Sequence, residues 1–139
     1  MLRKLKFLWQ RLTRGWDESE TWSLDYTVAK FVLPRLKFFR DNLHGHPDRT
    51  PTGKPLTFEG WQEILDKMIF SFEHIADESW EDKFFTPDPD IPEDAPMFDE
   101  KGQYISRSKE FDKKGYTAVQ KKIDEGIKLF GLYFRHLWD

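Results

Sequence analysis

The side chains best suited to bind a ligand are aromatic and basic residues in two stretches of the chain. The first stretch carries Trp22, Tyr26, Arg35, Lys37 and Arg40, and the second carries Tyr133, Arg135, His136 and Trp138. Aromatic rings stack on bases, and basic groups hold phosphate, arginine with two parallel hydrogen bonds. If the two stretches lie on long antiparallel helices, the groups meet and form a site for a small nucleotide-like ligand. The alternative is that the rings belong to the core and the charges are solvated.

We assign roles within this predicted site by chemical type. The stacking groups are Trp22, Tyr26, Tyr133 and Trp138, and the phosphate ligands are Arg35, Lys37, Arg40 and Arg135. The spacing of these residues matches no specific nucleotide-binding motif.

Two further clusters contain the side chains of metal sites. Asp41, His44 and His46 form the first, and Glu73, His74, Asp77 and Glu78 form the second. The first suits Zn²⁺ or Fe²⁺, but it lies in a loop rich in Gly and Pro and has no identifiable fourth ligand. The second would make a metal-dependent phosphohydrolase, but the repeated Glu-x-x-His pairs of di-metal helical bundles are missing. We therefore predict no metal and no cofactor, and keep the phosphohydrolase as a lesser alternative.

Motifs of nucleophilic catalysis are also missing from the sequence. It has no Gly-x-Ser-x-Gly, no phosphate-binding Gly-rich loop, no Gly-x-Gly-x-x-Gly and no cysteine, and only four histidines could serve as a general base. We expect a binding protein rather than an enzyme.

Charge is unevenly distributed along the 139 residues. Residues 1–56 carry 11 basic and 6 acidic side chains, residues 57–100 carry 2 and 14, and residues 101–139 carry 9 and 5. This separation disfavours a uniformly basic nucleic-acid-binding protein. The acidic segment either folds back onto the basic ends or acts on a partner, in which case the protein is a protein–protein inhibitor.

The spacing of apolar residues predicts a mainly α fold, with three to four helices forming a small bundle with a long acidic Pro-rich insertion. The helices are expected over 2–14, 22–42, 58–76 and 107–138, with a loop over 44–57 and a cap at Thr57. Pro34 should kink or break the second helix, and Gly115 should divide the last one. Gly126 and Gly131 suggest a close approach by another helix or by a ligand. The length favours a single domain, 1–139.

Residues 77–105 form the predicted acidic arm. Four prolines and ten acidic residues exclude a long helix there, whereas large apolar side chains argue against a disordered linker. We expect an extended arm pinned by those side chains. A short hairpin is expected around Lys101–Gly102, between Met97–Phe98 and Tyr104–Ile105.

The basic helix predicted over 2–14 has leucines and Trp9 at steps of three and four. We expect it to pack those residues on its own domain and to leave its basic face in water. A membrane-surface or phosphate-binding helix is the alternative. No apolar run is long enough for an integral membrane helix and no secretory signal is visible, so we expect an intracellular protein. Because 23 aromatic residues are many to bury in this length, we also expect a homo-oligomer.

Three stretches of the chain carry a resemblance. They contain Trp-Ser-Leu-Asp and Pro-Arg-Leu within residues 22–36, Trp-Gln-Glu-Ile-Leu-Asp-Lys-Met from Trp61, and a final Leu-Trp-Asp within residues 126–139. Together they resemble a family of small bacteriophage proteins with no assigned activity. The resemblance implies an accessory protein in the host cytoplasm that antagonises antiviral defence. Such a protein sequesters a nucleotide-derived immune signal or blocks a host protein by contact.

Overall fold

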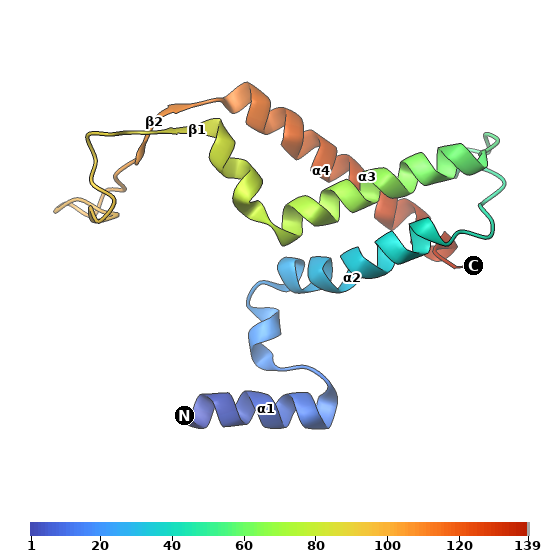
Figure 1. The fold of residues 1–139 in the computed structure, drawn as a ribbon, viewed down its shortest axis with the longest axis horizontal. Helices are drawn as coiled ribbons and strands as arrows, with labels where there is room; N and C mark the ends of the chain where they lie inside the picture. Colours follow the sequence, from blue (N-terminus) through green and yellow to red (C-terminus); the bar gives the residue numbers. More distant parts are fainter. Residues whose placement is uncertain (139) are drawn as a thin grey trace. The chain divides into compact units, whose positions relative to one another are not determined.

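The structure is a computed structural model that describes residues 1–138. It is mainly helical, as predicted (Figure 1). In chain order the elements are α1 (Leu2–Arg14), the 3₁₀ helix η1 (Glu18–Thr21), α2 (Leu24–Asp41), α3 (Phe58–Ala76), the 3₁₀ helix η2 (Glu78–Phe84), β1 (Phe85–Pro87), β2 (Ser108–Phe111), α4 (Lys113–Tyr133) and the 3₁₀ helix η3 (Phe134–His136). No helix in this described part is both long and apolar enough to cross a membrane.

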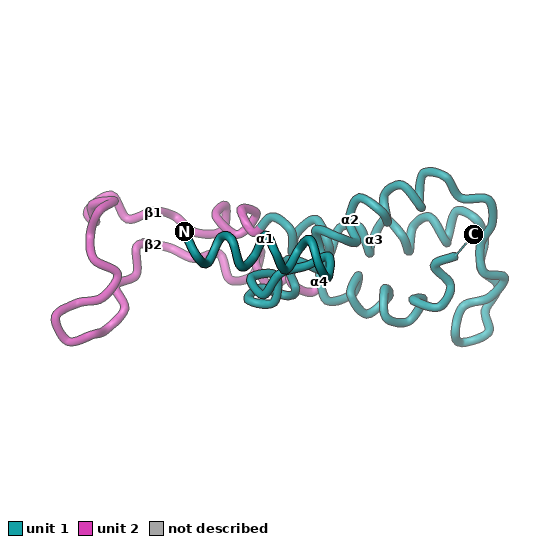
Figure 2. Tube along the Cα trace, turned by 90° about the horizontal axis from the view of Figure 1, so that it is seen from below, with its two compact units in different colours: residues 1–77, 122–139 teal, residues 78–121 magenta. Residues whose placement is uncertain are grey.

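The chain divides into two compact units, which Figure 2 shows in different colours. The first unit comprises residues 1–77 and 122–139, and the second comprises residues 78–121. The predicted acidic arm, 77–105, therefore falls almost entirely within the second unit. Helix α4 begins in the second unit and ends in the first.

The core of the first unit lies on α3, with α2 running alongside it (Figure 1). Trp61, Leu65, Met68 and Phe72 follow the spacing of one helical face, and each is at most 3% exposed. Ala29 and Leu36 of α2 and Tyr133 of α4 complete the buried cluster. The bounds of α3 agree with the prediction, and the Thr57 hydroxyl accepts the backbone N–H of Gly60 as an N-cap.

Neither Pro34 nor Gly115 divides its helix. Helix α2 continues through Pro34 to Asp41, and α4 continues through Gly115. Ala29 and Leu36 are both buried, so packing on either side of Pro34 holds the helix together despite one lost hydrogen bond. At Gly115, the Asp112 carboxylate accepts the backbone N–H at 2.9 Å, which supports the first turn of α4.

The second unit contains a short antiparallel strand pair. Phe85 of β1 lies opposite Phe111 of β2, and the two rings stack with centroids 4.6 Å apart. This pairing corrects the predicted last helix, 107–138, because residues 108–111 are extended and α4 begins at Lys113. Cross-strand aromatic packing outweighs helix propensity over those four residues.

The hairpin predicted around Lys101–Gly102 is confirmed. Phe98 and Tyr104 form an antiparallel bridge, and the Ile105 N–H donates to the Met97 carbonyl at 3.0 Å. Gly102 has φ of 75°, a left-handed conformation that glycine adopts without strain.

Helix α1 has the predicted bounds and ends at Gly15, which has φ of 82°. The predicted orientation of its faces is wrong. Leucines and Trp9 are exposed, whereas Gln10 is buried and three polar side chains contact residues 17–18. Asp17 and Glu18 attract the cations of α1, so the polar face packs inward.

A candidate ligand pocket beside Trp61

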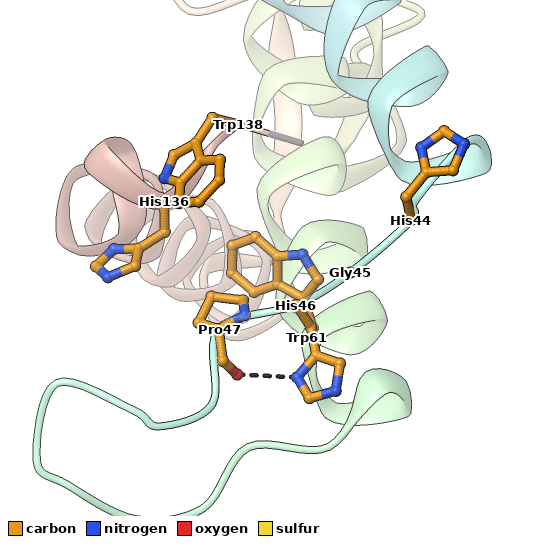
Figure 3. A pocket seen from close by; sticks show the side chains of 7 residues that line it. All are labelled: His44, Gly45, His46, Pro47, Trp61, His136 and Trp138. Atoms are coloured by element: carbon orange, nitrogen blue, oxygen red, sulfur yellow. Dashed lines mark hydrogen bonds between the residues drawn. The ribbon is translucent and has the colours of Figure 1, made fainter.

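A pocket of about 280 Å³ opens beside the N-terminal part of α3 (Figure 3). It is lined by residues of the loop after α2, of α3 and of the C-terminal segment, namely His44, Gly45, His46, Pro47, Trp61, His136 and Trp138. Two indoles and three imidazoles thus contribute to one small cavity. All seven residues belong to the first compact unit.

The floor of this pocket is fixed by the core. Trp61 is 1% exposed, and its indole lies 5.3 Å from the ring of Tyr133 at an interplanar angle of 59°. Tyr133 is itself buried, which raises the pKa of its hydroxyl above the ordinary value. Trp138 is 75% exposed, so it offers an accessible aromatic surface at the rim.

The loop after α2 is closed by its own hydrogen bonds. The Leu56 N–H donates to the Asp48 carbonyl at 2.9 Å, and the Thr50 N–H donates to the Lys54 carbonyl at 2.8 Å. Within the pocket, the His46 Nδ1 lies 2.9 Å from the Pro47 carbonyl oxygen, and the imidazole packs edge-on against Phe58. Backbone and ring contacts therefore both orient His46.

The imidazoles do not converge as metal ligands do. In Figure 3, His44, His46 and His136 lie on separate sides of the pocket, around Trp61 and Pro47. Within residues 1–138, no three His, Cys, Asp or Glu side chains are grouped to hold a metal ion. The geometry instead suits separate hydrogen bonds between imidazoles and the polar edge of an organic ligand.

Three residues of the two clusters that we considered as metal sites make other contacts. Asp41 lies 3.7 Å from Arg40 and does not line the pocket. Glu73 forms an ion pair with Lys37 at 2.7 Å, and the His74 Nδ1 lies 2.7 Å from the Phe70 carbonyl oxygen.

Two residues of the second predicted aromatic and basic group, His136 and Trp138, line the pocket. Tyr133 supports Trp61 from the core. Arg135 is exposed in η3, between these two residues in sequence. The ring of His136 lies 6.0 Å from that of Tyr133.

The aromatic residues of the first predicted group lie at the other end of α2 from the pocket. Trp22 packs against Phe7 with ring centroids 5.9 Å apart, and the Arg3 guanidinium lies 4.6 Å from its ring centroid. Tyr26 is paired with Lys30, whose Nζ lies 5.1 Å from the ring centroid. The structure therefore does not bring Trp22 and Tyr26 together with Trp138.

The cations of the first group are engaged along α2. Arg40 donates hydrogen bonds of 2.8 and 3.2 Å to the Asp66 carboxylate, which raises the pKa of the guanidinium. Lys37 pairs with Glu73. These contacts join α2 to α3.

Arg35 contacts its own helix, where it donates a hydrogen bond to the Phe31 carbonyl at 2.8 Å. Its guanidinium lies 3.8 Å from the centroid of the Phe31 ring, beside a second cavity of about 300 Å³. The other residues that line this cavity are apolar: Phe31, Val32, Leu36, Phe39, Phe130 and Leu137. It lies between α2 and the C-terminal part of the chain and offers one charged group only. The antiparallel arrangement that the predicted site required is not found, because the ends of α2 and α4 lie at the same pocket, beside His44 and Trp138.

Sequence reasoning missed the role of Trp61 and of the loop. Trp61 fits the apolar stripe of α3, so its pattern indicates a core residue. The signal available was the pair His44 and His46 beside Gly45 and Pro47, which we interpreted as a weak metal cluster.

Comparison of the chain with family models, curated proteins and solved structures gives no match.

Proposed function

We propose that this protein binds a small nucleotide-like ligand, without converting it, in the pocket beside Trp61. The observation that supports the proposal is the pairing of an accessible indole, Trp138, with a rigid aromatic floor, Trp61, in a cavity bordered by imidazoles. Stacking of a base on an aromatic ring contributes about 1–3 kcal/mol and tolerates any base. Imidazoles supply donors and acceptors for the ligand's polar edge.

The cavity volume limits the ligand. At about 280 Å³ it lies just below the roughly 300–1,000 Å³ of ordinary small-molecule sites. One base or one mononucleotide fragment fills it, and the rest of a larger nucleotide extends along the surface. Of the predicted phosphate ligands, Arg135 is the nearest in sequence to the pocket residues His136 and Trp138, and it is exposed. We assign it the role of phosphate ligand.

From the resemblance to small phage proteins, we also propose a biological role for this binding. A protein that holds an unmodified nucleotide lowers its free concentration, and it thereby antagonises a host defence that signals through that nucleotide. This role requires tight binding and a molar excess of protein over signal rather than turnover. It places the protein in the host cytoplasm.

Native mass spectrometry with a panel of linear and cyclic nucleotides tests the proposal. We expect a nucleotide adduct of fixed stoichiometry and unchanged mass. Trp138→Ala should weaken binding about 5- to 160-fold, the range that the stacking energy implies. Trp22→Ala is the matched control, because Trp22 is a similarly exposed indole, 63% against 75%, outside the pocket.

Three outcomes would contradict the proposal. Equal losses in both tryptophan variants would show that the adduct does not depend on this pocket. A ligand recovered as product would identify an enzyme. If the protein binds none of the nucleotides in the panel, its ligand is not a nucleotide.

One observation favours a second candidate function, inhibition of a protein partner. The hairpin of the second unit exposes Met97, Phe98 and Tyr104 by 55–65%, next to the carboxylates of Asp99 and Glu100. Exposed aromatic residues often anchor protein interfaces, and neighbouring acids favour a basic partner. Phe98→Ser should abolish capture of such a partner and leave nucleotide adducts unchanged.

A further inference from the structure

Helix α1 carries an apolar face that no part of the described chain covers. Its large apolar side chains are between 54% and 85% exposed, namely Leu2, Leu5, Leu8, Trp9 and Leu12. Their spacing of three and four residues places them on one side of the helix. A contiguous patch of this kind on a protein surface marks an interaction site.

The opposite face of α1 is held by residues 17–18. Lys6 forms an ion pair with Glu18 at 2.9 Å, and the Gln10 amide donates to the same carboxylate at 2.8 Å. The Glu18 N–H donates back to Gln10 Oε1 at 3.1 Å, and Arg11 pairs with Asp17, which is fully buried. The apolar face is therefore turned outward by specific polar contacts.

The charge of α1 indicates what covers this face. The helix has five basic residues and no acidic one. Two of the five pair with Glu18 and Asp17, whereas Arg3, Lys4 and Arg14 form no ion pair with any of residues 1–138. Face-to-face packing of a second copy brings like charges together, but an anionic surface neutralises them.

We propose that α1 lies on an anionic lipid membrane, with its leucines and Trp9 in the headgroup region and the cations that form no ion pair, Arg3, Lys4 and Arg14, on lipid phosphates and carboxylates. Interfacial helices share this composition, with Leu and Trp on one face and Lys and Arg on the other. At 13 residues, α1 is about 20 Å long, so it lies flat on the membrane. A helix this short binds reversibly, and its attraction depends on both the apolar face and the charge.

Co-sedimentation of the full chain with lipid vesicles tests the proposal. We expect binding to vesicles of phosphatidylcholine mixed with phosphatidylserine, little binding to phosphatidylcholine alone, and release by added salt. Leu12→Glu should lower the partition coefficient by about tenfold or more, because it places a charge in the apolar face. Phe38→Glu is the matched control: Phe38 is 71% exposed on α2, close to the 77% of Leu12, and the charge change is the same.

A second pair of variants tests the electrostatic part. Lys4→Glu should lower binding severalfold, whereas Lys128→Glu, an equal charge change at an exposed position of α4, should not. Circular dichroism should show equal helix content in all four variants.

The proposal is overturned by any of three results. The first is no binding to the anionic vesicles. The second is binding that Leu12→Glu and Phe38→Glu reduce equally. The third is a dimer in light scattering that Leu12→Glu dissociates while vesicle binding is absent, which would assign the apolar face to a second copy of the chain.

Discussion

Gly126 of α4 lies against Ser71 of α3 so closely that a Cβ at position 126 would overlap the Ser71 Oγ and stand 2.8 Å from the Ser71 Cβ. The Ser71 hydroxyl, which is fully buried, donates to the Ile123 carbonyl at 2.7 Å. Ser71 thus forms a hydrogen bond to the backbone of α4, and the absence of a side chain at Gly126 lets the two helices come this close. This contact holds the C-terminal part of α4 against α3, where Tyr133 packs against Trp61.

Gly126→Ala is expected to destabilise the protein by about 1–3 kcal/mol, the usual cost of overpacking a tight contact. Gly131→Ala is the control on the same helix, since a Cβ there meets nothing within 4 Å. It should stabilise α4 by about 0.4–1 kcal/mol through the lower entropy of the unfolded chain. Urea unfolding of both variants measures the difference, and equal effects would contradict the close approach.

Arg40→Ala and Asp66→Ala test whether Arg40 is a structural or a ligand-binding residue. The Arg40 side chain is 30% exposed and that of Asp66 is 52% exposed, so a double-mutant cycle should give a coupling of about 0.2–1 kcal/mol. Arg40→Ala should leave nucleotide affinity unchanged, because the Arg40 guanidinium is already hydrogen-bonded to the Asp66 carboxylate. A loss of binding in Arg40→Ala that Asp66→Ala does not reproduce would restore Arg40 as a phosphate ligand.

The sequence predicted the elements more accurately than their contacts. The period of apolar residues defines α1 and α3 to the residue, since each has a clear stripe and a recognisable end at Gly15 or Thr57. It misplaced the start of α4, because the pairing of Phe85 with Phe111 is a contact between distant segments. It also reversed the faces of α1, since Asp17 and Glu18 act through a turn that periodicity does not describe.

The pocket was harder to predict for a similar reason. Residue type pointed to Trp138, which lines the pocket, but also to Tyr133 as a stacking group, and Tyr133 is buried in the core. Trp61 has the pattern of a core residue and serves as core and floor at once. The assignment of Lys37 and Arg40 to phosphate did not consider the acids of α3 that face them. Whether a cation is available depends on its neighbours in space, which spacing along one helix does not reveal.

Phe85 and Phe111 should stabilise the second unit jointly. Their stacked rings, 4.6 Å apart, predict a coupling of about 0.5–1.5 kcal/mol between Phe85→Ala and Phe111→Ala. Hydrogen exchange of the Asp112 N–H, which donates to the Phe84 carbonyl at 2.8 Å, reports the opening of this strand pair. Additive effects of the two substitutions would show that the rings do not interact.

Acid should release α1 from residues 17–18. Hydrogen bonds from Ser19 and the charge of Arg11 hold the pKa of Asp17 below its ordinary value, and hydrogen bonds from Lys6 and Gln10 do the same for the pKa of Glu18. A lowered pKa means that each carboxylate contributes stability above its unfolded-state pKa, near 4. That contribution disappears as the pH falls through the lowered folded-state pKa.

Asp17→Asn should therefore increase amide exchange in α1 at neutral pH, and the difference from the unsubstituted protein should vanish at low pH, where Asp17 is protonated. Asp124→Asn, at an exposed carboxylate of α4, is the control and should leave α1 unchanged at every pH. Detachment of α1 also loosens the orientation of its apolar face. If α1 exchanges at the same rate in Asp17→Asn and in the unsubstituted protein at neutral pH, these polar contacts do not hold the helix.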